Sequence, residues 1–294
     1  MRISGFTYER VSVGEVTLNV ASGGAGPPIV LLHGFPQTHL AWRHVATDLA
    51  TDHRVICPDL RGYGDSDKPA DDPGGLTYAK RTMATDIVEL LRRLGHGRFA
   101  MAGHDRGGLV AFRLGLDHPD AVSHLAVLDV IPPAQMFKAL TGTAGVFAFH
   151  LYLLAYPPPL PEQLIGAAPE VFFDHFLDAW TKEPSAIPAE VRAAYLAAAC
   201  TPEAIQAVCA DYRASAFADS AHDEQDRSAG RRLQMPVAAL WQDLGEVELP
   251  FDPAAVWKGW APRLRTAALD CGHFLPEERP RQVTAALREL VDGS

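Results

Sequence analysis

The sequence of 294 residues predicts an α/β protein in which a mostly parallel, doubly wound sheet is interrupted by a helical insertion. Continuous apolar runs that end in glycine, such as PPIVLLHG at 27–34, are typical of buried parallel strands and alternate with helical patterns. This alternation stops after residue 130 and resumes near residue 233. We therefore expect a core formed by residues 1–130 and 233–294, with residues 131–232 as a helical cap.

The first part of the core begins with a predicted hairpin, in which segments 6–13 and 16–21 flank Gly14 and Glu15. Strands and helices then alternate, as expected for a sheet that is covered on both faces. The sequence predicts strand 27–34, helix 38–50, strand 54–60, helix 77–94, strand 98–105, a helix from Gly107 and strand 124–130.

The cap and the second part of the core differ in composition. The cap is rich in proline at YPPPLP and in alanine at AEVRAAYLAAAC, and shows no strand pattern. Its charged end, DSAHDEQDRSAGRR at 219–232, is predicted to be an exposed link back to the core. Strand 235–242, helix 253–260, strand 265–270 and helix 281–291 complete the chain.

Composition limits the classes of partner. The chain is 48% hydrophobic and 21% charged, which is typical of a soluble globular protein. Its formal net charge of -10 argues against nucleic acid and anionic membranes, which need a basic face. Without a signal-like or membrane-spanning apolar run, and with four scattered cysteines, we expect a cytoplasmic protein with free thiols. The histidines lack metal-ligand spacing, so no metal site is expected.

The stretch GHDRGG at 103–108 has the Gly-x-nucleophile-x-Gly spacing of a hydrolase elbow, with Asp105 at the place of the nucleophile. Gly103, Gly107 and Gly108 provide the space that a sharp strand-to-helix turn needs. The helix N-terminus that follows favours a negative charge. Asp105 as a mere N-cap is the alternative, but capping does not explain glycines on both sides.

A nucleophile elbow needs a base, an orienting acid and backbone donors. His273, in DCGHFLPEE after the last predicted strand, is the candidate base. Asp129 and Asp243 each follow a predicted strand and compete as the acid that orients it. The backbone N–H groups of Phe35 and Arg106 are the candidate donors for the developing oxyanion.

An aspartate nucleophile indicates attack at an sp3 carbon. Serine would leave an ether there, which water and a histidine cannot cleave, whereas Asp105 leaves an ester, which they can. His273 would then activate water against the Asp105 carbonyl carbon and release an alcohol. Halide displacement and epoxide opening both fit this chemistry, with a small molecule as substrate.

The chain resembles the α/β-hydrolases of the epoxide hydrolase and dehalogenase group, and most of all the fluoroacetate (haloacetate) dehalogenases. The resemblance spans nearly the whole chain, cap included. It implies the α/β-hydrolase fold, Asp129 as the acid, a mechanism without cofactor or metal, and a homodimer. It rests on HGFPQTHLAW, DLRGYGDSDKP, GHDRGG, LDHPDAV, LAVLDVIP, DYRA and GHF, which match that group's pattern in order.

The resemblance also implies substrate contacts, with two departures. Arg106 would pair with a substrate carboxylate, but Leu109 stands where a second arginine would complete the clamp. His150 and Tyr212 match two halide-binding cap residues, whereas Leu151 replaces a tryptophan. Fluoride needs several donors, so these losses predict weak fluoroacetate turnover and a roomier, more apolar pocket.

Two alternatives to a haloacid dehalogenase remain at this point. An epoxide hydrolase uses two cap tyrosines to protonate the epoxide oxygen, and Tyr212 fits one of them. His150 falls at the place of the other, which Tyr152 or Tyr156 would have to replace. The second alternative is a catalytically idle binding protein that keeps the fold. The presence of Asp105 together with a histidine and an acid argues against it.

Overall fold

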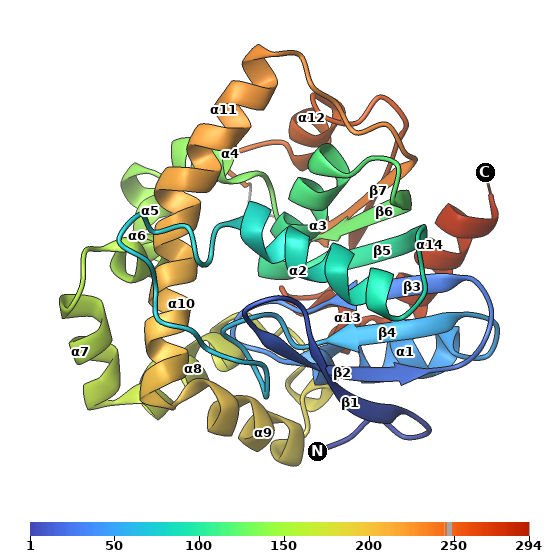
Figure 1. Ribbon diagram of the computed structural model, residues 1–294. Coiled ribbons are helices and arrows are strands. Elements are labelled where there is room, and N and C mark those ends of the chain that lie inside the picture. The colour runs from blue at the N-terminus through green and yellow to red at the C-terminus, as the bar shows by residue number, and fades with distance from the viewer. Residues whose placement is uncertain (244, 246–248, 294) are drawn as a thin grey trace.

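Eight strands form one sheet in the computed structural model, which describes residues 1–243, 245 and 249–293 (Figure 1). Their order is β1-β2-β4-β3-β5-β6-β7-β8. β1 and β2 form the predicted antiparallel hairpin, β2 is also antiparallel to β4, and β3 to β8 run parallel. The strands are β1 (Thr7–Ser12), β2 (Thr17–Gly23), β3 (Pro28–Leu32), β4 (Arg54–Pro58), β5 (Phe99–His104), β6 (Val122–Leu128), β7 (Val237–Gln242) and β8 (Leu264–Leu269).

Helices cover both faces of this sheet, which explains the continuous apolar runs of its strands. In β3, Val30 and Leu32 belong to the hydrophobic cluster on one face, and Ile29 and Leu31 to the cluster on the other. The first face is covered by α2, α3 and α12, and the second by α1 and α14. The core helices are η1 (His39–Trp42), α1 (Arg43–Leu49), α2 (Lys80–Arg93), α3 (Arg106–Asp117), α12 (Pro253–Lys258), α13 (Leu275–Glu278) and α14 (Pro280–Asp292).

Between β6 and β7 the chain is helical, and in Figure 1 most of these helices lie together at one side of the sheet. α10 packs against α6, α7 and α9 and so holds the group together. The helices are α4 (Pro133–Ala139), α5 (Gly142–Phe147), α6 (Phe149–Ala155), α7 (Leu160–Ala167), α8 (Pro169–Ala179), η2 (Pro184–Ala186), α9 (Ala189–Ala199), α10 (Pro202–Ala214), η3 (Ser215–Asp219) and α11 (Ser220–Ser228).

The predicted exposed link at 219–232 is helical for most of its length, and its exposure holds for one face only. Its first part forms the end of η3 and α11, in which Asp219, Asp223 and Asp226 are buried, whereas Glu224 and Arg227 are exposed. The buried residues recur at helical spacing, so their carboxylates share one face of the helix. The high charge therefore belongs to a helix with one face in a charged interface and the other in solvent.

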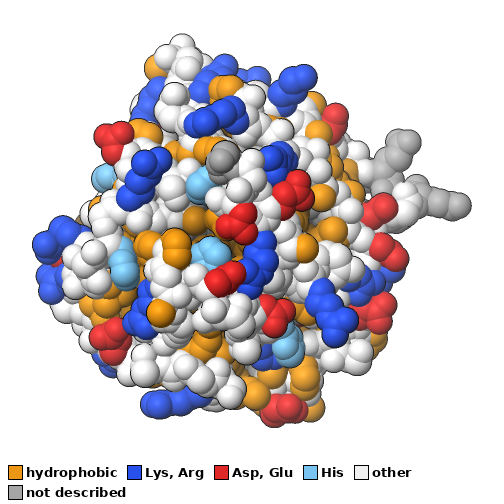
Figure 2. Space-filling view, turned by 90° about the vertical axis from the view of Figure 1, so that its right-hand side faces the viewer, with side chains coloured by type: hydrophobic (Ala, Val, Ile, Leu, Met, Phe, Trp, Pro, Cys, Tyr) orange, Lys and Arg blue, Asp and Glu red, His pale blue; other side chains and the backbone are white. Residues whose placement is uncertain are grey.

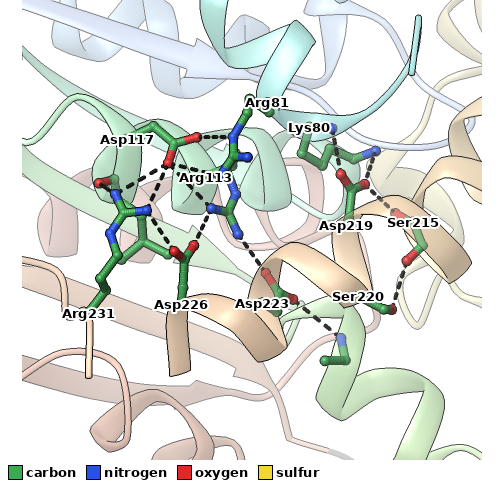
Figure 3. A network of polar contacts seen from close by, with 12 residues as sticks. Lys80, Arg81, Arg113, Asp117, Ser215, Asp219, Ser220, Asp223, Asp226 and Arg231 are labelled. Atoms are coloured by element: carbon green, nitrogen blue, oxygen red, sulfur yellow. Dashed lines mark hydrogen bonds and ion pairs between the residues drawn. The ribbon is translucent and has the colours of Figure 1, made fainter. Parts of the chain in front are cut away.

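That interface joins the insertion to the core through ion pairs (Figure 3). Asp219 Oδ2 lies 3.5 Å from Lys80 Nζ at the start of α2. Asp223 accepts a hydrogen bond of 2.9 Å from Arg113 of α3, and Asp226 pairs with the same guanidinium. Burial raises the pKa of Asp223 to about 7, although the charge of Arg113 opposes the shift.

Outside this interface the structure shows neither a single-sign charged face in Figure 2 nor, among the described residues, a membrane-spanning helix or a metal-binding cluster. On the face shown in Figure 2, basic and acidic side chains are interspersed among uncharged ones. Within the described ranges, no helix has the length and apolar character to cross a membrane. The same ranges hold no group of three or more His, Cys, Asp or Glu side chains arranged to bind a metal ion.

Candidate active site

Five residues from distant parts of the chain meet beyond the carboxyl ends of the parallel strands. Phe35 follows β3, Asp105 follows β5, Asp129 follows β6, Gln242 ends β7 and His273 follows β8. Ligand sites of open α/β sheets form at this edge because the strand-to-helix loops converge there. The sheet topology therefore brings the predicted residues together.

Asp105 occupies the sharp turn between β5 and α3. Its φ of 49° lies in a region that is uncommon for residues other than glycine. A Cβ atom on Gly103 would lie 2.2 Å from the carbonyl oxygen of Gly107, and one on Gly107 would lie 2.4 Å from that of Leu32. The two glycines are thus required by close backbone packing, as the elbow pattern predicts.

The Asp105 side chain does not act as a helix cap. It forms no capping hydrogen bond with α3, although Asp105 occupies the N-cap position. Its Oδ1 instead accepts a hydrogen bond of 2.8 Å from the backbone N–H of Phe35. The Arg106 amide is the first of α3, and such amides lack an intrahelical acceptor. The carboxylate is therefore displayed at the elbow with a backbone donor on one oxygen.

His273 is held by the first of the two candidate acids. Its Nδ1 lies 2.6 Å from Oδ2 of Asp129. Asp129, itself at a φ of 49°, is fixed by Gln242, whose backbone N–H and Nε2 donate hydrogen bonds of 2.9 and 2.8 Å to its carboxylate. The Nε2 atom of His273 is buried and has no partner among the described residues. One ring nitrogen is therefore anchored and the other is available.

The second candidate acid, Asp243, lies elsewhere. It is exposed, and its Oδ1 accepts a hydrogen bond of 2.9 Å from the backbone N–H of Gly245. Among the described residues, Asp129 is the carboxylate that contacts His273. The preceding β7 contributes Gln242 instead, and sequence analysis missed this residue because a glutamine at a strand end carries no distinctive signal.

Three histidines near the elbow have shifted pKa values. Burial lowers the pKa of His273, but the hydrogen bond and charge of Asp129 and the charge of Asp105 raise it to a net value above the ordinary 6.5. Burial lowers the pKa of His104 to about 4 and that of His150 to about 3. His150 and His104 are therefore neutral at physiological pH.

The side chain of Arg106 is committed to an ion pair. It is 1% exposed, and its Nε and Nη2 donate hydrogen bonds of 3.0 and 2.8 Å to the two carboxylate oxygens of Asp211. Nη2 also donates to Ser215 Oγ at 2.6 Å, and Lys80 pairs with the same Asp211 carboxylate. A buried aspartate of the insertion thus neutralises this guanidinium, which also lines the cavity, and its pairing with a substrate carboxylate stays a prediction.

A cavity of about 720 Å³ opens over the elbow. His150 and Leu151 line it as predicted. Leu109 and Tyr212 are buried and are not among the described lining residues. The Tyr212 ring lies under the guanidinium carbon of Arg106, 4.1 Å from the ring centre. The lining residues are Asp105, Arg106, Asp129, Val130, Ile131, Met136, Leu140, Thr143, Ala144, Phe147, Ala148, His150, Leu151, Trp180, Leu240, Trp241, Gln242, Leu249, Pro250, Phe251, Pro253, Trp257 and His273.

Trp180 is a second residue that sequence analysis missed. Its ring contacts two histidines of the site, with centroids 4.9 Å from both His150 and His273. Its backbone carbonyl accepts a hydrogen bond of 2.8 Å from the His273 N–H. Trp180 directly follows the aromatic-rich α8, where nothing in the sequence separates a packing indole from one that faces the site.

Two further tyrosines lie outside the site. Tyr152 is 43% exposed, and its hydroxyl donates a hydrogen bond of 2.7 Å to the Leu140 carbonyl oxygen. Tyr156 is 53% exposed. Neither belongs to the described lining of the cavity. They therefore do not replace His150 as a partner for Tyr212.

Comparison with known proteins agrees with this architecture. Residues 27–152 match the family described as the alpha/beta hydrolase fold. The fluoroacetate dehalogenase of a Burkholderia species is 40% identical over 99% of this chain and 95% of its own. The soluble epoxide hydrolase of Corynebacterium sp. (strain C12) is 33% identical over 94% of each chain.

Solved structures show the same likeness. A candidate α/β hydrolase from Nostoc sp. PCC 7120 superimposes with a TM-score of 0.96 at 39% identity, covering 99% of this chain and 100% of that one. The epoxide hydrolase CorEH gives a TM-score of 0.85 at 30% identity, covering 98% of this chain and 99% of that one. The chain therefore belongs to the α/β-hydrolase family, in the group that contains fluoroacetate dehalogenases and soluble epoxide hydrolases.

Proposed function

We propose that the chain is a hydrolase in which Asp105 attacks an sp3 carbon and forms an alkyl-enzyme ester, with an organic halide as substrate. The observation that carries this proposal is the carboxylate at the elbow, with Phe35 donating to its Oδ1. The Nε2 of His273, which has no partner among the described residues, lies nearby in the same cavity. The likeness to a fluoroacetate dehalogenase supports a carbon–halide bond as the target.

The first half of the reaction needs only the carboxylate. One oxygen of Asp105 attacks the substrate carbon, a C–O bond forms, and the halide leaves with the electrons of the carbon–halide bond. Neutral N–H donors that line the cavity would stabilise the departing anion. His150 is one such side chain, because its lowered pKa keeps it neutral and its buried Nδ1 has no partner among the described residues.

The second half uses His273. Its Nε2 removes a proton from water, whose oxygen attacks the Asp105 carbonyl carbon. The Phe35 N–H stabilises the oxyanion that develops. The bond from the carboxyl carbon to the ester oxygen then breaks, and the alcohol takes the proton from His273. Asp105 keeps the oxygen of water and releases its second proton, which restores the carboxylate. Asp129 would keep the imidazole oriented and stabilise its charged form.

Epoxide hydrolysis is the second candidate, since the same two steps would open an epoxide. The likeness to a soluble epoxide hydrolase supports it. The structural observation in its favour is the pairing of His150 with Tyr212, whose ring centroids lie 5.8 Å apart beside Phe35. His150 lines the cavity and would donate to the epoxide oxygen, whereas Tyr212 is not among the described lining residues.

Trapping of the ester distinguishes these candidates. A His273→Gln variant would be exposed to fluoroacetate, chloroacetate, 2-chloropropionate, 1-chlorobutane and 1,2-epoxybutane, and its peptides examined by mass spectrometry. We expect an alkyl or carboxyalkyl adduct on Asp105 from a halide, whereas a hydroxyalkyl adduct would assign epoxide hydrolysis. The Asp105→Ala/His273→Gln double variant is the control. An Asp105 that stays unmodified throughout would contradict the proposal and favour an idle binding protein.

A further inference from the structure

The cavity over Asp105 is far larger than a haloacetate needs. Its volume of about 720 Å³ lies within the range of about 300 to 1,000 Å³ that is typical of sites for much larger, drug-sized ligands. A haloacetate has only a two-carbon skeleton. A substrate that small would leave most of the apolar wall in contact with water, without gain from its burial.

The charges around this cavity do not favour an anion. The ionisable side chains among its described lining residues are Asp105, Arg106, Asp129, His150 and His273. Arg106 is the only permanent cation of this set. Its Nε donates to Asp211, and its Nη2 donates to Asp211 and Ser215.

The ion-pair cluster behind Arg106 is balanced. Two cations, Lys80 and Arg106, face two buried carboxylates, Asp211 and Asp219. Because these four charges cancel, the cluster supplies no excess positive charge to attract a substrate carboxylate. That carboxylate would also lie close to the ionised nucleophile, where like charges repel.

The wall away from the reactive histidines is apolar and reaches the surface. α4 contributes Met136, α5 contributes Ala144 and Phe147, and the segment before α12 contributes Phe251. Phe147 is 84% exposed, although it lines the cavity. The cavity therefore runs from the buried elbow to an open mouth beside α5, along a route that suits an extended apolar chain.

We infer that the natural substrate is an uncharged electrophile with an apolar tail of several carbons, which lies along α4, α5 and residues 249–253, and not a haloacid. This inference rests on the proposed function, because the reacting carbon must be the one that Asp105 attacks. Asp211 sets the specificity by neutralising Arg106, and the wall that contains Met136 and Phe147 binds the tail.

The test compares three probes that carry the same bromomethyl group next to a carbonyl and differ in charge and in the length of the apolar tail. The His273→Gln variant would be treated with bromoacetate, 2-bromoacetamide and N-hexyl-2-bromoacetamide, and the rate of Asp105 alkylation measured by peptide mass spectrometry. We expect bromoacetate to be slowest and the hexyl amide fastest, with a gain of about fourfold for each methylene that is buried. Peptide analysis separates this reaction from alkylation of the partly exposed Cys200.

Two outcomes are distinguishable. Faster alkylation of Asp105 by bromoacetate than by either amide, or no gain from the hexyl chain, would overturn the inference while the proposed function stands. No alkylation of Asp105 by any probe, under conditions in which Cys200 reacts, would overturn the proposed function and the inference with it.

Two variants of α5 locate the tail. Ala144→Trp places an indole in the cavity and should reduce the rate with the hexyl amide at least tenfold, with little change for 2-bromoacetamide. Val146→Trp is the matched control, since Val146 lies on the same helix, is 69% exposed and is absent from the described lining. Equal losses for both amides in Ala144→Trp, or equal effects of the two variants, would contradict this placement.

Discussion

The imidazole of His273 and the carboxylate of Asp129 are 144 positions apart in the chain and meet at 2.6 Å. This contact links the ends of β6 and β8 across β7, which lies between them in the sheet. β7 takes part through Gln242, which donates two hydrogen bonds to the same carboxylate. The imidazole of His273 is thus positioned by three parallel strands.

Asp129→Asn should lower the pKa of His273 and slow hydrolysis of the ester. His273 must be neutral to accept a proton from water, so this step should speed up as pH rises through its raised pKa. Without the charge of Asp129, the midpoint should move to lower pH, and the maximal rate should fall by about 10²- to 10⁴-fold because the imidazole loses its orientation. Single-turnover ester hydrolysis between pH 5 and 9 measures both effects.

Asp243→Asn provides the matched control for that experiment. Asp243 is exposed and bonded to the backbone of Gly245, so neither the midpoint nor the rate should change. An unchanged midpoint of the pH dependence in Asp129→Asn, or a shifted midpoint in Asp243→Asn, would contradict the assignment of Asp129 as the carboxylate that sets the pKa of His273.

Much of this site could be predicted from the sequence, because the elbow depends on local geometry. GHDRGG specifies a turn in which side chains are excluded by backbone atoms, and PPIVLLHG and HLAVLDV specify buried strands whose ends must converge. The choice between Asp129 and Asp243 could not be made from spacing alone, since both follow core strands. Resolving it required the register of β6, β7 and β8.

The missed features depend on contacts between distant segments. Asp211 is one residue before Tyr212 in α10, and no local pattern shows that its carboxylate reaches Arg106 of α3. Asp219 and Asp223 were mistaken for part of a solvated run because their cationic partners, Lys80 of α2 and Arg113 of α3, lie more than a hundred residues earlier in the chain. Among the described ion pairs of the buried aspartates, only that of Asp226 with Arg231, five residues later, joins charges that are close in sequence.

Gly103→Ala should destabilise the protein through the elbow. The new Cβ would lie 2.2 Å from the Gly107 carbonyl oxygen, which is backbone and cannot move aside cheaply. We expect a loss of about 1 to 3 kcal/mol or more in the free energy of unfolding. Gly166→Ala in α7 is the control, because its Cβ meets nothing within 4 Å, and it should be neutral or stabilising by up to about 1 kcal/mol. Urea unfolding measures both, and equal stabilities would refute the packing argument.

Asp211→Asn should destabilise the chain by about 3 to 5 kcal/mol, because it leaves Lys80 and Arg106 buried with less compensating charge. Adding Lys80→Met to this variant removes one of the two cations and should restore part of the loss. Denaturant unfolding of the single and double variants gives the coupling free energy between Asp211 and Lys80. If Lys80→Met restores none of the stability that Asp211→Asn loses, the charges of the cluster are not balanced as described.

Glu278 should act as a positioning residue for ester hydrolysis. Its Oε2 accepts backbone hydrogen bonds of 3.1 Å from Gly272, and of 2.9 Å from both Lys182 and Glu183, so it ties the loop of His273 to the segment after Trp180. Glu278→Ala should slow hydrolysis of the ester more than its formation, since ester formation needs the Asp105 carboxylate, whereas hydrolysis also needs His273 of this loop.

Separate measurement of the two half-reactions tests this role, with Glu278→Gln as the conservative variant. The glutamine keeps one carbonyl oxygen as an acceptor and should recover part of the hydrolysis rate. An equal decrease in ester formation and hydrolysis would indicate a general loss of structure.

The proposed mechanism requires that Asp105 is the nucleophile and that water attacks its carboxyl carbon. Turnover of a chloroalkane or haloacid by the wild-type enzyme in ¹⁸O-labelled water, followed by peptide mass spectrometry, tests both requirements. In a single turnover with enzyme in excess, we expect the label in the Asp105 peptide and unlabelled oxygen in the alcohol. Label in the alcohol and none in Asp105 would show that water attacks the substrate directly, and would contradict the account.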